Sequence, residues 1–305
     1  MPTFDAHSTT DDILKDADLQ GTRVLVTGTS AGLGVETARS LSARGAQVTG
    51  VVRDVEKARA KLEQAGAEGV ELYQADLASL TSLRNFTDDY RASGERIDVL
   101  IANAGIMACP PATTEDGFEL QFGTNHLGHF VLVNRLVTQL ETDGRIVILS
   151  SAAHRHSDVN LDDPNFEHTP YEEWKAYGRS KTANALFALE LDRRLQDRNI
   201  RAASVHPGVI ETELMRHLTP ETSKRSGAGK MQRKTVGQGA ATTIWAGFAA
   251  DADHVGGKYA EDCAVSPVID DPRQRPGVMR YATDPQSAQE LWSLSEEMVG
   301  ETFNL

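Results

Sequence analysis

The sequence predicts an α/β fold with a single doubly wound parallel sheet and helices on both of its faces. Three observations lead to this prediction. Short apolar, β-branched runs alternate with helix-patterned segments nearly throughout the chain. The strand runs are apolar on both faces, as in parallel sheets that helices cover. A glycine-rich turn joins the first run to the first helical segment. Right-handed crossovers then make the expected fold Rossmann-like.

The individual elements follow in order along the chain. Strands are expected at Arg23–Thr27, Gln47–Val52, Gly69–Tyr73, Val99–Ala102, Arg145–Ser150 and Arg201–His206. Helices are expected at Val35–Arg44, Glu56–Ala65, Leu80–Arg91, Gly117–Glu141 and Tyr177–Gln196. Ligands of such sheets bind beyond the carboxyl ends of the strands, so the residues that follow each strand are the first candidates for a site.

The 305 residues suffice for one large domain or two small ones, and no change in composition divides them. We expect a polar N-terminal extension over residues 1–20, one Rossmann-fold domain over 21–260, and a C-terminal extension over 261–305 that packs on the same domain. Residues 157–175 are acidic and predict a surface insertion. Residues 212–235 are rich in Arg and Lys and predict a mobile substrate lid. A helical pattern between Asp284 and Thr302 predicts a helix that caps the sheet.

The composition excludes several classes of protein. A net charge of −13 argues against a nucleic-acid surface and against docking on an anionic membrane. The start of the chain is polar and acidic, and no apolar run approaches the roughly 20 residues of a membrane span. The two cysteines, Cys109 and Cys263, lie far apart and predict free thiols in a reducing compartment. A soluble cytoplasmic protein is the expectation.

The most informative motif is the turn Thr-Gly-Thr-Ser-Ala-Gly-Leu-Gly at residues 27–34. A strand that breaks at glycine and restarts as a helix directs backbone N–H groups and the positive end of a helix dipole at one place, which suits a pyrophosphate. Glycine lets the phosphates approach the backbone and permits positive φ in the tight turn. A glycine-rich turn that binds nothing is the alternative. A Walker-type loop is excluded because no Lys-Ser/Thr pair follows the glycines.

The residues after the next strands point to a dinucleotide. Arg53 follows the second strand, where an arginine accommodates the extra phosphate of NADP, whereas Val52 cannot bind the ribose of NAD. Asp54 is the rival ribose ligand, but it suits a helix N-cap better, and Arg53 could also be an ordinary solvated charge. Asp76 could hold the adenine edge or merely cap a loop. Small residues in Asn103-Ala104-Gly105 allow flat groups to approach the backbone.

The spacing Tyr-x-x-x-Lys occurs twice, as Tyr171/Lys175 and Tyr177/Lys181. It places both side chains on one helix face, where an ammonium lowers the pKa of a phenol toward the range of a general acid–base. The first pair lies in the acidic insertion. The second opens a strong helical pattern after the fifth strand, and for that reason we prefer Tyr177 and Lys181.

Three further segments near the strand ends carry candidate site residues. Either hydroxyl of Ser150-Ser151 could donate to a substrate carbonyl oxygen, although such a pair is more often only a turn. Residues 122–130 place two glycines and an asparagine inside a helix pattern, where each glycine costs roughly 1 kcal/mol, which indicates a site. His154 and His156 lack the further ligands that zinc would need, so no metal is expected.

Taken together, these residues resemble the short-chain dehydrogenase/reductase family. The matching set is Thr27-Gly28-x-x-x-Gly32-x-Gly34, Asn103-Ala104-Gly105, Asn125, Ser151, Tyr177-x-x-x-Lys181 and Pro207-Gly208, in family order over roughly Gly21 to Tyr259. The segments Ser150-Ser151-Ala152-Ala153-His154, Val205-His206-Pro207-Gly208-Val209 and Gly256-Gly257-Lys258-Tyr259 resemble the retinol dehydrogenase and WW-domain oxidoreductase branch. Protochlorophyllide reductases are near relatives. The membrane anchor of animal retinol dehydrogenases is not expected here, which argues against membrane-dissolved retinoids as substrates.

The resemblance implies a role for each matched residue. Tyr177 would transfer the proton, Lys181 would lower its pKa and bind the nicotinamide ribose, Ser151 would polarise the carbonyl, and Asn125 would hold a water that links Lys181 to solvent. The expected cofactor-binding residues are Gly28, Ser30, Gly32, Leu33, Gly34, Arg53, Asp76, Leu77, Asn103, Ala104, Gly105, Tyr177, Lys181, Pro207, Val209 and Thr212. A homodimer through the helices that carry Asn125 and Tyr177 is implied by the family alone.

The expected function is an NADP(H)-dependent oxidoreductase that interconverts an alcohol and a ketone or aldehyde, with NADP(H) favoured over NAD(H). The expected substrate pocket is mostly apolar and suits a lipophilic or aromatic molecule. Its residues are Met107, Ser151, His154, Leu214, Met215 and Leu218, together with Val209. Two alternatives stay open: a C=C (enone) reductase, and a catalytically silent NADPH-binding regulator. The basic lid could bind an anionic substrate group, close over cofactor phosphates, or be only a solvated loop.

Overall fold

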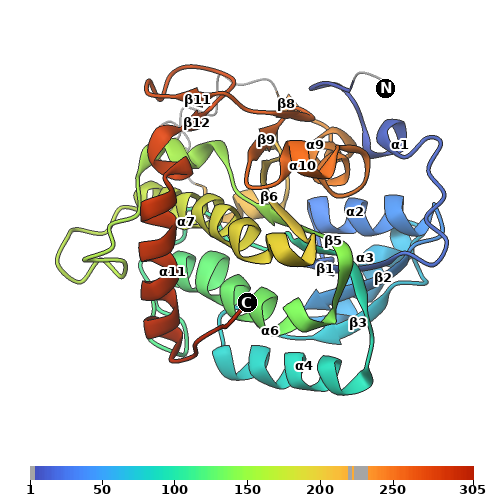
Figure 1. Ribbon diagram of the computed structural model, residues 1–305, viewed down its shortest axis with the longest axis horizontal. Helices are drawn as coiled ribbons and strands as arrows, with labels where there is room; N and C mark the ends of the chain where they lie inside the picture. Colours follow the sequence, from blue (N-terminus) through green and yellow to red (C-terminus); the bar gives the residue numbers. More distant parts are fainter. Residues whose placement is uncertain (1–3, 219–221, 223–232) are drawn as a thin grey trace.

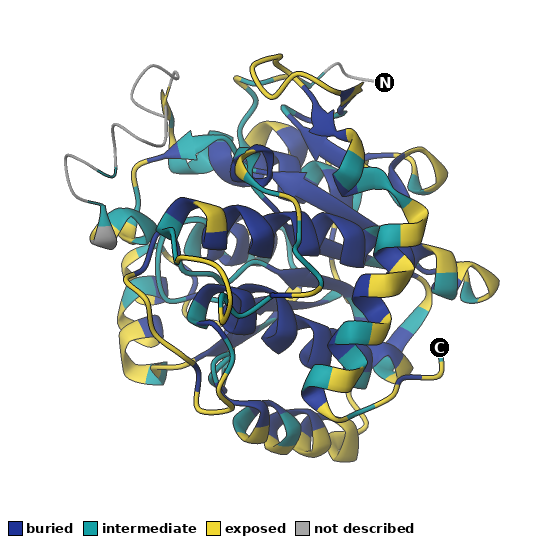
Figure 2. Cartoon of the chain, turned by 90° about the vertical axis from the view of Figure 1, so that its left-hand side faces the viewer, coloured by how far each residue is buried: buried dark blue, intermediate teal, exposed yellow. Residues whose placement is uncertain are grey.

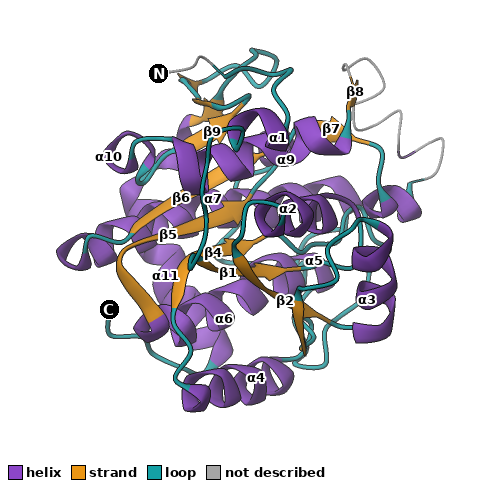
Figure 3. Ribbon diagram, turned by 90° about the vertical axis from the view of Figure 1, so that its right-hand side faces the viewer, coloured by secondary structure: helices purple, strands orange, loops and turns teal. Residues whose placement is uncertain are grey.

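The computed structural model describes residues 4–218, 222 and 233–305 of the chain. In this part of the chain the central sheet has eight strands in the order β10-β9-β6-β5-β4-β1-β2-β3, and all neighbours are parallel except β9 and β10 (Figure 3). Its strands are β1 Arg23–Thr27, β2 Gln47–Val52, β3 Glu71–Gln74, β4 Ile97–Ala102, β5 Leu140–Leu149, β6 Arg201–His206, β9 Tyr259–Glu261 and β10 Ala264–Val265. The predicted doubly wound, Rossmann-like fold is confirmed.

Helices cover both faces of the sheet (Figure 1). The described α-helices are α1 Thr10–Ile13, α2 Gly32–Ser42, α3 Val55–Gln64, α4 Leu80–Ser93, α5 Leu120–Phe122, α6 Gly128–Leu136, α7 Glu173–Leu195, α9 Val236–Ile244, α10 Ala252–Val255 and α11 Pro285–Val299. Among the residues that the structure describes, two further parallel pairs lie outside the central sheet: β7 Val209–Ile210 with β8 Arg233–Lys234, and β11 Val268–Ile269 with β12 Val278–Met279.

The alternation of side chains along the strands separates two hydrophobic cores. In β1, Leu25 packs into the core under α4, α6 and α7, whereas Val24 and Val26 pack into the core under α2 and α9. In β5, Ile146 belongs to the first core and Val147 to the second. Successive strand residues point to opposite faces, so apolar residues at every position are what a sheet covered on both sides requires.

The long predicted helix at Gly117–Glu141 is wrong in its bounds. The structure has α5, a π-helical segment Gly123–Leu127, α6 and a 3₁₀ turn, and then strand β5, which begins at Leu140. The glycines here serve close packing. A Cβ on Gly123 would lie 2.5 Å from Cγ2 of Thr114, and one on Gly128 would lie 2.4 Å from the carbonyl oxygen of Leu77. Tertiary contact therefore outweighs the helix penalty of glycine.

Other element boundaries also differ from the prediction. Strand β3 is shifted toward the C-terminus, to Glu71–Gln74. Helix α7 begins at Glu173, four residues before Tyr177, so the last residues of the predicted insertion form its first turn. Much of the predicted lid, residues 219–221 and 223–232 with Lys224, Arg225 and Lys230, lies outside the described residues.

The two ends of the chain pack on the central body. Ile13, Leu14 and Leu19 join the core under α2, although the N-terminal segment is mainly polar. Helix α11 packs across α7 rather than on the sheet itself (Figure 1), and its Trp292 packs against Phe130 of α6 and Phe187 of α7. Helices α6 and α7 are buried along nearly their whole length (Figure 2). Among the described residues, no helix combines the length and apolar character needed to cross a bilayer.

Candidate active site

A groove of about 580 Å³ opens where the glycine-rich turn and the segments after the neighbouring strands meet. Fifteen of the sixteen expected cofactor-binding residues line it. They are Gly28, Ser30, Gly32, Leu33, Gly34, Arg53, Asp76, Leu77, Asn103, Ala104, Gly105, Tyr177, Lys181, Pro207 and Thr212. Val209 lines the adjacent pocket instead. The structure thus brings together residues that the sequence spreads over almost two hundred positions.

The wall of the groove under the turn consists of backbone. Gly28 has φ +79°, and a Cβ there would lie 2.8 Å from Cβ of Ala104. A Cβ on Gly34 would lie 2.1 Å from the carbonyl oxygen of Gly28. Helix α2 begins here, and its N-cap residue Ala31 offers no side-chain acceptor, so the first N–H groups of the helix are left for a ligand. A cradle that a side chain would fill, at an uncapped helix start, fits a pyrophosphate.

Hydrogen bonds between the ends of β1 and β4 hold the groove in shape. The hydroxyl oxygen of Thr27 accepts the N–H groups of Asn103 and Ala104, both at 3.0 Å, and lies 2.9 Å from Nε2 of His129. The side-chain amide of Asn103 donates to the carbonyl oxygen of Thr27 at 2.8 Å. Burial lowers the pKa of His129 to about 4. The ring is therefore neutral, and it joins the turn to the helix that carries Asn125.

At the far end of the groove, three charged side chains have identifiable partners. Asp54 accepts the N–H of Lys57 and is the N-cap of α3, as its sequence position predicts. Asp76 accepts the N–H of Ala78 at 2.9 Å, which is the loop-capping alternative, while it also lines the groove. Lys57 pairs with Glu213 at 2.6 Å. Arg53 is exposed and lines the groove.

Tyr177 and Lys181 lie on the same face of α7, and both line the groove. Each residue is only 4% exposed. The ammonium nitrogen of Lys181 lies 5.8 Å from the ring centre of Tyr177 and donates to the carbonyl oxygen of Leu149 at 2.9 Å. A Cβ on Gly105 would lie 3.6 Å from the same ammonium. The lysine head is thus held at the floor of the groove, one helical turn from the phenol.

The ionisation of this pair differs from the sequence expectation. Burial raises the pKa of Tyr177 to about 12, and the hydrogen-bonding side chain of Ser151 offsets part of that rise. Burial also lowers the pKa of Lys181 to about 7. The expected lowering of the phenol pKa by Lys181 is therefore outweighed here, because burial disfavours the phenolate and the ammonium alike.

The structure distinguishes the two adjacent serines. Ser150 is buried, and its hydroxyl donates to the carbonyl oxygen of Lys181 at 2.7 Å. Ser151 is partly exposed beside Tyr177, and its hydroxyl oxygen accepts the N–H of Ala153 at 3.1 Å as the N-cap of the 3₁₀ helix Ala152–His156. The hydroxyl of Ser151 therefore lies beside Tyr177 on the pocket wall, whereas the hydroxyl proton of Ser150 is committed to α7.

Asn125 lies in the π-helical segment and is fully buried. Its side chain accepts the N–H of Ile106 at 2.8 Å and donates to the carbonyl oxygen of Ile106 and to Ser180. Its own carbonyl oxygen lies 3.0 Å from Nδ1 of His129. These contacts tie the loop after β4 to α7, so Asn125 positions the elements that carry the groove.

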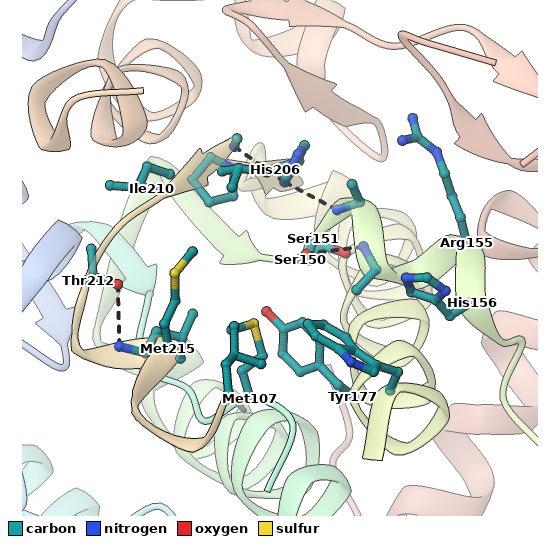
Figure 4. A pocket seen from close by; sticks show the side chains of 18 of the residues that line it. Met107, Ser150, Ser151, Arg155, His156, Tyr177, His206, Ile210, Thr212 and Met215 are labelled. Carbon is teal, nitrogen blue, oxygen red and sulfur yellow. Dashed lines mark hydrogen bonds between the residues drawn. The ribbon is translucent and has the colours of Figure 1, made fainter. Parts of the chain in front are cut away.

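A smaller pocket of about 200 Å³ adjoins the groove (Figure 4). Five expected substrate residues line it: Met107, Ser151, Leu214, Met215 and Leu218. The hydroxyl of Tyr177 points into it between Met107 and Ser151 (Figure 4). The groove and the pocket meet at six residues that line both cavities: Leu33, Ser150, Tyr177, Pro207, Thr212 and Leu214.

The structure does not place His154 on the pocket wall, which corrects the expectation for this residue. The side chain is fully buried, with Nδ1 at 2.7 Å from the carbonyl oxygen of Ser151, while Nε2 accepts the N–H of Met279 at 3.1 Å. The phenol of Tyr281 donates to the carbonyl oxygen of His154 at 2.6 Å. His154 thus links the loop of Ser151 to the C-terminal segment and supports the site from behind.

The other Tyr-x-x-x-Lys pair, Tyr171 and Lys175, has structural partners outside the site. The hydroxyl of Tyr171 donates to the carbonyl oxygen of Cys109 at 2.9 Å and accepts from the side chain of Gln121 at 3.0 Å. Lys175 lies 3.7 Å from Glu172. Neither Tyr171 nor Lys175 lines the groove or the pocket.

Several residues that line the pocket are not among the predicted site residues, and four of them have large side chains with polar groups: Trp174, Arg155, Arg275 and His206. Trp174 lies three residues before Tyr177, on the same helix. The sequence predicts a helix that begins only at Tyr177, so it does not indicate that the two side chains share a helix face. His206 accepts the N–H groups of Ala152 and Gly208 through Nδ1, at 3.2 and 3.4 Å. His206 stands at the end of a predicted strand and directly before Pro207-Gly208, and this position is the sequence signal that could have identified it as a site residue. Arg155 and Arg275 gave no local signal.

Comparisons with known proteins identify relatives of this chain. A family model described as short chain dehydrogenase matches residues 22–223. The chain is 41% identical to short-chain dehydrogenase/reductase prx1 of Penicillium rubens, over 97% of this chain and 91% of that protein. It is 39% identical to human retinol dehydrogenase 14, over 92% of this chain and 87% of that protein.

Solved structures show the same similarity. A crystal structure of a protein from Mycobacterium paratuberculosis aligns with a TM-score of 0.77 at 37% identity, over 98% of this chain and 100% of that chain. A short chain dehydrogenase from Burkholderia cenocepacia in complex with NADP aligns with a TM-score of 0.63 at 27% identity, over 81% of this chain and 99% of that chain.

Proposed function

The chain belongs to the short-chain dehydrogenase/reductase family, and we propose that it is an NADP(H)-dependent oxidoreductase that interconverts an alcohol and a ketone or aldehyde on a lipophilic or aromatic small molecule. One observation carries this proposal. The hydroxyl of Tyr177 lies where a groove walled by backbone meets a mainly apolar pocket. A dinucleotide fits the first cavity by its chemistry, and an apolar substrate fits the second.

Each part of the site has a task in this reaction. The glycine turn and the start of α2 would hold the pyrophosphate, with Asn103 beside the turn. Lys181 lines the groove one helical turn from Tyr177. When bound, the nicotinamide cofactor supplies or accepts the hydride. In the direction of reduction, Tyr177 donates its phenolic proton to the carbonyl oxygen, and Ser151 donates a hydrogen bond to the same oxygen. The ammonium of Lys181 stabilises the phenolate that remains.

NADP(H) rather than NAD(H) is proposed from the chemistry after β2. Arg53 is exposed on the groove wall, and Lys57 lines the same groove while it pairs with Glu213. The nearby carboxylate of Asp54 is occupied as the N-cap of α3. A cation at this place accommodates the additional phosphate of NADP, and a committed carboxylate does not bind the ribose of NAD. The relative from Burkholderia cenocepacia was solved with NADP.

A paired substitution tests the catalytic assignment. Tyr177→Phe removes the phenolic proton, and we expect turnover to fall by about 10³-fold or more while NADPH binding persists, since general acid–base groups contribute roughly 10²–10⁴-fold. Tyr171→Phe is the matched control, because it removes the same atom from the other Tyr-x-x-x-Lys pair, and we expect it to keep turnover. Reduction of aromatic aldehydes and ketones with NADPH is measured, with binding followed by calorimetry. Near-normal turnover of Tyr177→Phe would refute the assignment.

The two alternative functions give different results in the same assays. An enone reductase would saturate the C=C bond and leave the carbonyl intact, which product analysis by NMR detects. A silent regulator would bind NADPH and turn over nothing in a screen of ketones, aldehydes and alcohols with both cofactors.

We do not extend the proposal to a homodimer through α6 and α7. Helices α6 and α7 are buried within one chain, and α11 packs on α7. Trp292 of α11 contacts Phe130 of α6 and Phe187 of α7. Helix α11 therefore covers part of the surface of α7, and the homodimer stays a prediction from the family resemblance.

A further inference from the structure

The wall of the pocket is positively charged, although the chain as a whole is acidic. The chain has 44 acidic and 31 basic residues, yet the described residues that line the pocket include Arg155 and Arg275 and no aspartate or glutamate. His156 and His206 also line it, and burial lowers the pKa of both, so they are neutral at pH 7. The net charge of the pocket wall is therefore positive and comes from the two arginines alone.

Arg155 is a buried cation with incomplete compensation. Its side chain is 3% exposed, and Nη2 donates to the carbonyl oxygen of Gly277 and lies 3.7 Å from Glu261. Its Nε and Nη1 atoms are buried and have no hydrogen-bond partner among the described residues. The nearest oxygen of Glu261 already accepts from Ser266 and from the N–H of Gly277. A buried guanidinium with two unpartnered nitrogens is costly unless another negative charge lies nearby.

Arg275 lies at the exposed edge of the pocket, in the loop between β11 and β12. Its Nη1 donates to the carbonyl oxygens of Pro272 and Gln274, at 2.6 and 2.8 Å, and no described carboxylate lies within ion-pair distance. Burial and the charge of Arg155 lower the pKa of Arg275, and the charge of Glu261 offsets part of that lowering. Arg273, two residues away, has a carboxylate partner, Asp271 at 2.9 Å, and does not line the pocket.

We propose that the substrate carries an anionic group, such as a carboxylate, that Arg275 binds at the pocket mouth while the buried charge of Arg155 adds to the attraction. The inference rests on the proposed function and deepens it by naming a substrate class for the same pocket. The remaining walls, with Met107, Trp174 and Leu218, contact the apolar body of such a molecule. An exposed guanidinium provides the planar, bidentate donor set that a carboxylate prefers.

A pair of probes that differ only in charge tests this proposal. The probes are 4-formylbenzoate and its uncharged methyl ester, reduced with NADPH by the wild type, Arg275→Gln and Arg273→Gln. We expect Arg275→Gln to raise KM for the acid by about tenfold and to leave KM for the ester and kcat for both unchanged. Arg273→Gln is the matched control, because it removes an equal charge from the same loop, and it should change neither KM.

A binding measurement separates this inference from the proposed function. Calorimetry with the same probes is performed in the presence of NADP⁺, which has no hydride to transfer to an aldehyde. Tighter binding of the acid than of its ester, lost in Arg275→Gln and kept in Arg273→Gln, supports the anion site even if no probe is turned over. Equal binding of the two probes, or equal effects of the two substitutions, would overturn it. Absence of turnover by the wild type on every carbonyl tested would count against the proposed function alone.

Discussion

The groove and the pocket meet at Tyr177, yet they are built from different parts of the chain. The groove under the turn is walled by main chain from two short segments, residues 28–34 and 103–105, which lie at the ends of adjacent strands β1 and β4. The pocket is walled by side chains from six segments, between Leu33 at one extreme and Arg275 at the other. A site made of backbone is determined by short motifs, whereas a site made of side chains depends on how distant loops pack.

This difference explains why the sequence predicted the residues of the groove better than those of the pocket. Of the residues expected at the groove, Val209 alone lies elsewhere. Among the residues expected at the pocket, His154 is turned into the interior, while Trp174, Arg155 and Arg275 lie on the wall without having been expected. Substitutions in the two regions should therefore have different consequences, and four of them test this contrast.

The largest effect is expected at the backbone wall of the groove. Gly34→Ala places a Cβ 2.1 Å from the carbonyl oxygen of Gly28, which only a shift of the backbone can relieve. We expect NADPH affinity to fall by about 100-fold or more and the free energy of unfolding to fall by about 3 kcal/mol, at the upper end for overpacking. Gly69→Ala is the control, because a Cβ there meets nothing within 4 Å. Unchanged NADPH binding in Gly34→Ala would show that the turn does not form the wall we describe.

Lys181 lines the groove one helical turn from Tyr177, and its burial opposes stability. Its pKa is lowered from 10.5 to about 7 in the folded protein, so the unfolded chain binds more protons between these pH values. The full penalty applies below pH 7, and the wild type gains stability as the pH rises from 7 toward 10.5. We expect Lys181→Met to raise the free energy of unfolding by several kcal/mol at pH 6 and by less at pH 9, at about 1.4 kcal/mol per pKa unit.

Urea unfolding at the two pH values measures this difference. Lys175→Met, an exposed position on the first turn of the same helix, serves as the control and should show no such pH dependence. An equal gain for Lys181→Met at both pH values would mean that the lysine is not a desolvated cation. The variant should also lose turnover, so stability and activity move in opposite directions at this residue.

An intermediate effect is expected behind the pocket. His154→Leu removes the hydrogen bonds that join the loop of Ser151 to Met279 while it keeps a similar volume. We expect kcat to fall by about tenfold through a misplaced oxyanion donor, with the affinity for NADPH unchanged. His154→Gln, which retains a donor and an acceptor, should recover part of kcat. A change in NADPH affinity instead would show that the groove and the pocket are not separable in this way.

The smallest effect concerns cofactor preference at the rim of the groove. Arg53→Ser removes an exposed cation, and we expect the Kd for NADPH to rise by about tenfold and that for NADH to stay unchanged, as for the loss of one charged hydrogen bond. Arg59→Ser removes the same charge from the exposed face of α3 and should alter neither Kd. Equal weakening of both cofactors by Arg53→Ser would contradict the NADP(H) assignment.

The sequence by itself determined the sheet, the glycine turn and the Tyr-x-x-x-Lys geometry, because each of these depends on residues that are neighbours along one strand, turn or helix face. It could not decide between Tyr171 and Tyr177 by spacing, nor between Ser150 and Ser151. The structure separates both pairs by their hydrogen-bond partners, such as Cys109 for Tyr171 and Lys181 for Ser150.

Only the tertiary structure determined how the segment of His154 and Arg155 and the C-terminal segment come together at the pocket. Arg155 donates to Gly277 and His154 accepts from Met279, across 122 and 125 positions of the chain. The direction in which each of these side chains points depends on where the C-terminal segment packs, and no pattern near residues 154 and 155 records that. Contacts of this range arise from the burial of whole elements against one another, so they exist only once the chain has folded.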